Sequence, residues 1–322
     1  MNRSATIIRL AAQVLLLWSP ALRVPAQSAV PLTDHMIAQL ASRTNGTACG
    51  SYGLIAGNNS FSTSPVMAAN FWLAGVTNIN AEGNSLANGA LFPGGLTMVS
   101  PRHCVNAAHV GYSVMNVWIL PGGALYTNSV LAATNDGDIQ IELMARTNPF
   151  FAKIFPNATN QIGRWQRRGS GALPLFVRRH RGSNPLYWYE TNPAYEPTFV
   201  SGASSLGSFT AESEVRFGDY LESGDRNGPA SWPAGDRWIS GDSGGPAYGI
   251  INNEAVLVGC ATSPNFAEPL GLRLATLNHL MAWLSTNHAA PVYALTLYDL
   301  SAFPIVDSKN VPSPPSTRFP IH

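Results

Sequence analysis

Residues 240–246 read Ser-Gly-Asp-Ser-Gly-Gly-Pro, and this run decides how the rest of the chain is interpreted. Ser243 has glycines close on both sides, and glycine allows backbone angles that other residues avoid and lets a substrate approach closely. A serine nucleophile at a tight turn needs both properties, and backbone amides at such a turn can converge on a developing oxyanion. A bare G-x-S-x-G pattern would be weak evidence, but the full run is specific. It predicts that Ser243 is a catalytic nucleophile and that the amides of Gly241 and Ser243 form the oxyanion hole.

This run resembles the nucleophile motif of the chymotrypsin-like (trypsin-fold) serine peptidases, and the resemblance implies a histidine base upstream at the end of a strand. Residues 106–109, Asn-Ala-Ala-His, match that expectation, because they follow a Gly-Gly pair at 94–95 and the strand-like run 96–100 in the family's order. His109 is therefore the candidate general base. His103 lies nearby but lacks the preceding pair of alanines.

The third member of such a site is an aspartate that is followed by a short apolar strand. Asp138 precedes the run Ile-Gln-Ile-Glu-Leu and fits this description, whereas Asp136 is followed by Gly137, as a turn residue would be. The order His109, Asp138, Ser243 is that of the chymotrypsin-like group. The 29 positions from His109 to Asp138 resemble compact bacterial members, and the 105 positions from Asp138 to Ser243 imply an insertion.

The resemblance implies an exported serine endopeptidase that hydrolyses peptide bonds through an acyl-enzyme intermediate. Serine is a poor nucleophile at its own pKa and needs a positioned base. His109 would take the proton of Ser243 and return it to the leaving amine, because imidazole titrates near neutral pH. Asp138 would hold the imidazole tautomer and stabilise the imidazolium that forms.

The rest of the chain has the pattern of an all-β protein. Short apolar runs recur between turns rich in Gly, Pro and Asn, which is typical of a sandwich or barrel. Apolar residues at three- and four-residue steps predict one helix over 277–284; 34–42 is expected to be weakly helical at best, and 293–303 to be a further strand. The resemblance, which covers residues 67–290, implies two six-stranded antiparallel Greek-key β-barrels with a C-terminal helix. The apolar runs are residues 96–99, 114–120, 139–144, 173–177, 198–200 and 255–260.

Composition excludes several other classes of protein. Only 11% of the 322 residues are charged, against about 25% in an ordinary soluble domain, and 45% are hydrophobic, which excludes a disordered chain. A net charge of +1 gives no global attraction to nucleic acid or to an acidic membrane. The sequence has no H-E-x-x-H, C-x-x-C or Walker-type pattern. We therefore expect no metal, no cofactor, and a protein or peptide substrate; the sequence leaves the oligomeric state open.

The first 28 residues resemble an export signal, with Arg3 and Arg9 before a short apolar run over 10–17 and small residues from Ala26 onward. The apolar run is shorter than the roughly 20 residues that cross a bilayer. We therefore expect a secreted or periplasmic protein without a membrane segment after signal cleavage. The expected organisation is a signal peptide (1–28), an N-terminal extension or propeptide (29–66), a first barrel with His and Asp (67–160), a second barrel with Ser and an insertion (161–290), and a C-terminal extension with a Pro-rich tail (291–322).

Several positions depart from the family pattern. Val110 stands where animal members have cysteine, and no Ile-Val-Gly-Gly-like activation sequence precedes the first barrel. Asp242 is therefore expected to pair with an internal partner rather than with a freed N-terminus. Arg237 lies six residues before Ser243, where trypsin-like enzymes place the residue that determines specificity; it either favours acidic or C-terminal groups of a substrate or is a surface residue in a reshaped loop. Thr262 falls where the family has a serine that contacts the aspartate, and Arg237 and Thr262 are the candidate substrate-binding residues.

Two further features have more than one interpretation. Six arginines cluster over 164–181 with aromatic residues among and after them, which fits either a surface for nucleic acid or acidic polysaccharide or a solvated hairpin that pairs with the acids of 212–225. We favour the hairpin and expect no nucleic-acid partner. Cys49, Cys104 and Cys260 allow one disulfide at most, and three small buried side chains are an equal alternative.

Two other functions compete with the peptidase. An inactive protein of the same fold, acting as a binding or scaffold protein, would fit the missing activation sequence and a Trp238 that fills the substrate pocket. An α/β-hydrolase esterase would fit G-x-S-x-G, but that fold needs an acid and then a histidine after the serine. Asp299 or Asp307 with His322 is the late pair that provides this order, and the sequence does not alternate strands with long helices.

Overall fold

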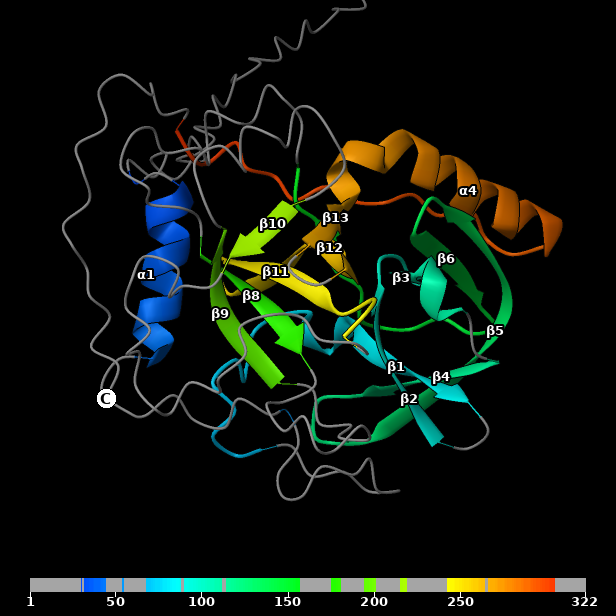
Figure 1. Cartoon of the computed structure of the whole chain (residues 1–322), viewed down its shortest axis with the longest axis horizontal. Coiled ribbons are helices and arrows are strands. Elements are labelled where there is room, and N and C mark those ends of the chain that lie inside the picture. Colours follow the sequence, from blue (N-terminus) through cyan, green and yellow to red (C-terminus); the bar gives the residue numbers. More distant parts are fainter. Residues whose placement is uncertain are drawn as a thin grey trace, which may run out of the picture.

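The residues that the structure describes form two β-sheets with a helix beside each, and Figure 1 shows their arrangement. The structure is a computed structural model. Helix α1 (Leu32–Thr44) lies against the second sheet, and α4 (Leu274–Asn287) lies against the first. The residues that the structure describes are 30, 32–44, 54, 68–87, 90–111, 114–156, 175–180, 194–200, 215–218, 242–263 and 266–304.

The first sheet is a closed barrel of six strands, and all of its pairings are antiparallel. The order around the barrel is β1-β2-β3-β6-β5-β4. The expectation of a six-stranded antiparallel barrel ahead of the serine is therefore confirmed. The strands are β1 (Glu82–Ala87), β2 (Ala90–Met98), β3 (His103–Ala107), β4 (Met115–Ile119), β5 (Leu125–Asp136) and β6 (Ile139–Met144).

Close packing around Trp118 explains a glycine in this barrel. The Trp118 side chain is fully buried, and its Nε1 donates a hydrogen bond to the backbone oxygen of Ala81 at 3.1 Å. A Cβ added to Gly83 on the neighbouring strand would lie 2.6 Å from that Nε1. Position 83 therefore accepts no side chain while the indole fills this space.

The second sheet has the strand order β11-β8-β9-β10-β13-β12-β7, with an additional pairing between β11 and β12. The short β7 joins β12 in parallel, and the other pairings are antiparallel. The β11–β12 hairpin turns at Asn252 and Asn253, both of which have left-handed φ angles, as asparagine tolerates. The strands are β7 (Lys153–Ile154), β8 (Leu175–His180), β9 (Ala194–Val200), β10 (Val215–Gly218), β11 (Pro246–Ile251), β12 (Glu254–Ser263) and β13 (Phe266–Pro269).

The predicted strands agree with this architecture except at one place. The six apolar runs overlap β2, β4, β6, β8, β9 and β12 in turn, so the mostly β fold is confirmed. The strand expected over 293–303 is wrong. That segment forms one isolated bridge between Leu297 and Ile154, because the strand edge it meets, β7, is only two residues long.

Helix α4 confirms the helix predicted over 277–284. It packs on β5 and β6 of the barrel and buries Leu277, Met281 and Leu284. Short 3-10 segments add to the helical content: η1 (Ile79–Ala81), η2 (Ala108–Val110) and η5 (Leu270–Arg273). No helix among the residues that the structure describes is long and apolar enough to span a membrane.

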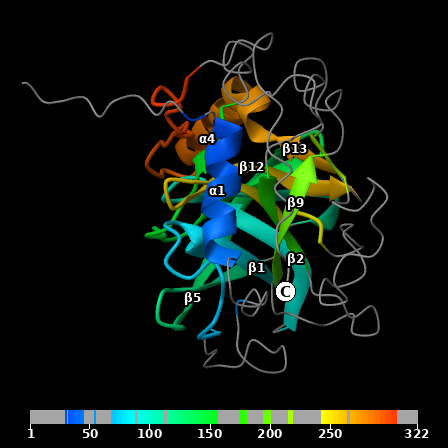
Figure 2. The same ribbon diagram turned by 90° about the vertical axis from the view of Figure 1, so that its left-hand side faces the viewer.

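Helix α1 is a regular helix that extends beyond residues 34–42, where the sequence predicted weak helicity at best. Leu32 and Met36 are fully buried in a cluster with residues of β11 and β12, and Figure 2 shows the helix in front of the second sheet. The Arg43 guanidinium donates to the backbone oxygens of Trp72 at 3.1 Å and Ala74 at 3.2 Å. Tertiary packing of one apolar face therefore stabilises a helix whose sequence alone signals little.

Candidate active site

The three residues expected to carry the chemistry lie side by side. His109 lies on η2 directly after β3, Asp138 in the turn before β6, and Ser243 just before β11. Nδ1 of His109 is 2.7 Å from Oδ2 of Asp138, and Nε2 of His109 is 2.7 Å from Oγ of Ser243. The two sheets therefore bring an aspartate, a histidine and a serine into one hydrogen-bonded chain.

The Asp138 carboxylate fixes both the ring and the backbone of His109. Its Oδ1 lies 2.9 Å from Nδ1 and accepts a hydrogen bond from the backbone amide of His109, also at 2.9 Å. A neutral imidazole that donates from Nδ1 to this carboxylate has a free lone pair on Nε2. That nitrogen can then accept the Ser243 proton, which is the geometry of a nucleophile and its base. The side chains of His109 and Asp138 are 46% and 31% exposed, so a substrate can reach them.

A two-residue turn places Asp138. Asp136 at the end of β5 pairs with Ile139 at the start of β6, which leaves Gly137 and Asp138 between the strands. Gly137 has a φ of 59°, in the left-handed region that glycine adopts without strain. Asp138 thus precedes the strand rather than forming its first residue, and the short turn fixes its direction.

Backbone contacts hold the Ser243 turn against the barrel. The oxygen of Ser243 accepts a hydrogen bond from the amide of Gly95 on β2 at 3.1 Å, and the amide of Gly244 donates to the oxygen of Ala261 on β12 at 2.7 Å. Gly244 has a φ of 78°. Asp242 is fully buried. The serine is therefore presented by a turn that is bonded to both sheets.

The two neighbouring alternatives lie elsewhere. His103 is fully buried, and its Nδ1 and Nε2 face the hydroxyl oxygens of Ser100 at 2.9 Å and Ser285 at 3.2 Å. Burial lowers the pKa of His103 to about 4. Asp136 forms an ion pair with Arg273 at 2.9 Å. Neither side chain contacts Ser243, so the geometry distinguishes Asp138 and His109 from both.

The other expected site residues have different outcomes. Gly241, Arg237 and Trp238 lie outside the described residues, so the oxyanion hole and the specificity residue stay predictions. Thr262 lies on β12 directly after Ala261, and its buried hydroxyl has no hydrogen-bond partner among the residues described. The expected contact with Asp138 is therefore not made as a hydrogen bond, and the carboxylate faces His109 instead.

The sequence left open whether the cysteines form a disulfide and what the arginine cluster does. Cys104 and Cys260 are buried and unbridged, so they are not partners in a disulfide, and Cys49 lies outside the described residues. Most of the arginine cluster, 164–181, also lies outside, as do all of the acids proposed to pair with it: Glu212, Glu214, Asp219, Glu222 and Asp225.

Sequence reasoning missed a buried polar cluster inside the first barrel. The carboxyl group of Glu142 is fully buried and accepts hydrogen bonds from Nδ2 of Asn116 at 2.6 Å and Nε2 of Gln140 at 2.9 Å. The Cys104 thiol also lies 3.3 Å from it. Burial raises the pKa of Glu142 and raises that of Cys104 well above its ordinary value. The alternating run Ile-Gln-Ile-Glu gave no signal of this, because such a pattern ordinarily has its polar face in solvent.

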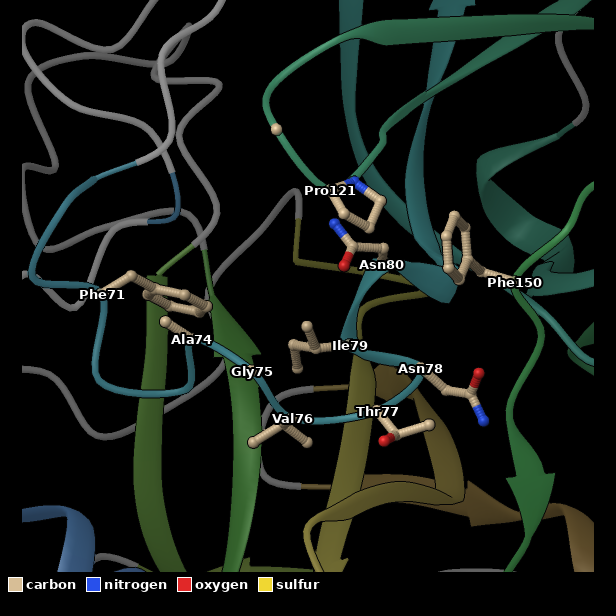
Figure 3. Close-up of a pocket in the computed structure, with 11 residues that line it drawn as sticks. Phe71, Ala74, Gly75, Val76, Thr77, Asn78, Ile79, Asn80, Pro121 and Phe150 are labelled. Carbon is tan, nitrogen blue, oxygen red and sulfur yellow. The ribbon is translucent and has the colours of Figure 1, made fainter.

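A separate pocket of about 630 Å³ lies away from these residues, and Figure 3 shows the side chains that line it. None of the three hydrogen-bonded residues contributes to it. Its apolar walls come from the segment before η1 and from the loops that carry Pro121 and Phe150. The lining residues are Phe71, Ala74, Gly75, Val76, Thr77, Asn78, Ile79, Asn80, Pro121, Gly122 and Phe150.

Comparison with known proteins finds a similarity to a serine protease. No protein-family model matches the chain. The chain is similar to "Serine protease EatA" of Escherichia coli O78:H11 (strain H10407 / ETEC), with 27% identity over 187 residues. The match covers 56% of this chain but only 13% of that relative's length. Together with the closed six-stranded antiparallel barrel, it supports a trypsin-like fold and a distant relation to a serine protease.

Proposed function

We propose that the protein is a serine endopeptidase that hydrolyses peptide bonds of a protein or peptide substrate. The observation that carries the proposal is the hydrogen-bonded chain from Asp138 through His109 to Ser243, with 2.7 Å at each step. Three segments far apart in sequence contribute to it, and its residues have the order of the chymotrypsin-like group. The similarity to a serine protease supports the same reaction class.

Each residue has a role that follows from its contacts. Oγ of Ser243 attacks the scissile carbonyl carbon while Nε2 of His109 takes its proton. The imidazolium then protonates the leaving amine, which releases the first product and leaves an acyl-enzyme. A water molecule, deprotonated by the same nitrogen, hydrolyses the acyl group and restores Ser243. Asp138 holds the tautomer that donates from Nδ1 and stabilises the imidazolium of both steps.

The amides of Gly241 and Ser243 are proposed to bind the oxyanion that forms in each step. One such donor contributes a factor of about 10² to 10³ to the rate. Arg237 and Thr262 are proposed to contact the substrate beside the scissile bond, Thr262 through its backbone because its hydroxyl is buried. Arg237 would favour acidic or C-terminal groups, because a guanidinium binds carboxylates with two parallel hydrogen bonds.

We also propose that the second sheet is a second six-stranded barrel. The pairings β11–β8, β8–β9, β9–β10, β10–β13, β13–β12 and β12–β11 connect six strands in a ring, which supports this. The site would then lie between two barrels, with the base and acid on one and the nucleophile on the other. The signal-like residues 1–28 support export to the periplasm or the medium.

Hydrolysis of a fluorescently quenched casein by the purified full chain tests the proposal. The wild type should cleave it at neutral pH, and Ser243→Ala should lower kcat by about 10⁶. Ser129→Ala, which removes an exposed hydroxyl on β5, is the matched control and should keep full activity. Folded wild-type protein that cleaves neither casein nor a diverse peptide library would contradict the peptidase and favour an inactive binding protein.

A further inference from the structure

Asn106, the next-to-last residue of β3, holds both ends of the turn that carries His109. Its side chain is fully buried. Its Oδ1 accepts a hydrogen bond from the amide of Ala107 at 2.7 Å, and its Nδ2 donates to the oxygen of Gly111 at 3.4 Å. One carboxamide is thus bonded to the first amide and the last carbonyl of residues 107–111.

Asp138 binds the middle of the same turn. Its backbone oxygen accepts from the amide of Ala108 at 2.7 Å, and its Oδ1 accepts from the amide of His109 at 2.9 Å. A single-turn 3-10 segment has too few internal hydrogen bonds to hold its own shape. Asn106 therefore completes at the two ends the support that Asp138 provides in the centre.

The same carboxamide lies against the turn that carries the serine. A Cβ added to Gly244 would lie 2.1 Å from Oδ1 of Asn106 and 2.1 Å from the oxygen of Gly95. Only a glycine permits this approach, and the φ of 78° at Gly244 also favours glycine. The next residue back along the chain is Ser243, whose oxygen is bonded to Gly95.

We infer that Asn106 is a positioning residue that sets the distance between Nε2 of His109 and Oγ of Ser243. The inference rests on the proposed peptidase function. Asn106 does not touch the reacting atoms; it fixes the His109 turn by hydrogen bonds and the Ser243 turn by contact with Gly244. A displacement of about 1 Å between reacting groups can cost about 100-fold in rate.

Asn106→Ala, compared with Asn128→Ala, tests the inference. Asn128 is a matched control, because it is also buried in the first barrel and its carboxamide is bonded to the backbone oxygen and amide of Arg146 at 2.7 and 2.9 Å. The measurements are kcat and KM on a peptide substrate and the rate at which a fluorophosphonate labels Ser243. Melting temperatures of all variants show how much stability each substitution removes.

Asn106→Ala should lower kcat and the labelling rate by about 10- to 100-fold with KM within about twofold, while Asn128→Ala keeps both near the wild-type values. Asn106→Leu retains the approximate size but removes both hydrogen bonds, so it should lose as much activity as Asn106→Ala. Because it preserves the volume, it carries the test if the alanine variant does not fold.

The outcomes separate the two proposals. A wild type that the fluorophosphonate does not label would contradict the peptidase itself. A wild type that is labelled on Ser243, with both Asn106 variants labelled at the wild-type rate, would overturn the positioning role alone. Equal losses of activity in Asn106→Ala and Asn128→Ala at equal losses of melting temperature would also overturn it, because a general structural effect would then account for both.

Discussion

The two ends of strand β3 each present a histidine, and the two are held in opposite ways. His103 begins the strand, is fully buried, and has a serine hydroxyl at each ring nitrogen. His109 follows the end of the strand, is exposed, and has a carboxylate at Nδ1 and a serine hydroxyl at Nε2. The residue type is the same, so the difference in function must come from the partners and from solvent.

The comparison shows why His109, rather than His103, is the candidate base. Burial without a carboxylate lowers the pKa of His103 to about 4, so this ring stays neutral at physiological pH. The Asp138 carboxylate beside His109 can stabilise the imidazolium that proton transfer creates. His103 is thus suited to a structural role between the barrel and helix α4, and His109 to catalysis.

Of the substitutions compared, replacement of His109 should have the largest effect on kcat, and replacement of His103 should have little. His109→Ala should lower kcat for peptide hydrolysis by about 10⁶, because Ser243 loses its base. His103→Asn, measured in the same assay at pH 7.5, should keep kcat within a few fold. A similar loss of kcat in both folded variants would break the distinction between the two ends of the strand.

Substitutions of the two aspartates at the β5–β6 connection should have the next largest effect on kcat. Asp138→Asn should lower kcat by about 10⁴, because an amide no longer enforces the tautomer that donates from Nδ1. Asp136→Asn removes only the half-buried ion pair with Arg273 and should change kcat within a few fold. Steady-state kinetics on one peptide substrate measures both, and a greater loss in Asp136→Asn would reverse the assignment.

Much of the site could be predicted from local sequence. The glycines around Ser243, the alanines before His109 and the strand after Asp138 are all contiguous signals. Which aspartate meets the histidine depends on the direction of a two-residue turn, and the carboxylate that lies beside His109 is that of Asp138. Asn106 gave no signal, because its partners at Gly111 and Gly244 are brought to it by the turn and by the second sheet.

The barrel interior could not be predicted for a different physical reason. Glu142 occupies a position that alternates with apolar residues, which ordinarily indicates a solvent-facing side chain. Closure of the sheet turns that face inward, where Asn116 and Gln140 donate hydrogen bonds to the carboxyl group. Helix α1 was underestimated similarly, because its stabilising contacts come from β11 and from Trp72 and Ala74, which are distant in sequence.

The acid stability of the protein should reflect His103. Its pKa is 6.5 in the unfolded chain and about 4 in the folded one, so the unfolded state binds the proton more readily as the pH falls. Stability is therefore full above pH 6.5 and declines by about 3 kcal/mol toward pH 4. Urea unfolding between pH 4 and 7.5 should show that His103→Asn removes this part of the decline. His279→Asn, at an exposed site on α4, should leave it unchanged.

Glu142 should give the smallest effect, with the opposite sign. Its pKa is raised in the folded state, so the folded protein binds the proton more readily and stability falls as the pH rises above the ordinary glutamate value of 4.5. Glu142→Gln should remove this fall, so the free energy of unfolding of the variant should no longer decrease for this reason between pH 4.5 and 7.5. The same urea titration measures it, and an unchanged slope between pH 4.5 and 7.5 would contradict a pKa raised by burial.

Peptide mapping of the full chain after reaction with a fluorophosphonate tests the central assignment most directly. The account predicts one phosphonyl group per molecule, located on Ser243, and a labelling rate that falls by several orders of magnitude in His109→Ala while His103→Asn keeps the wild-type rate. A folded wild-type protein that takes up no label, or takes it up on a different serine, would contradict the Asp138–His109–Ser243 site.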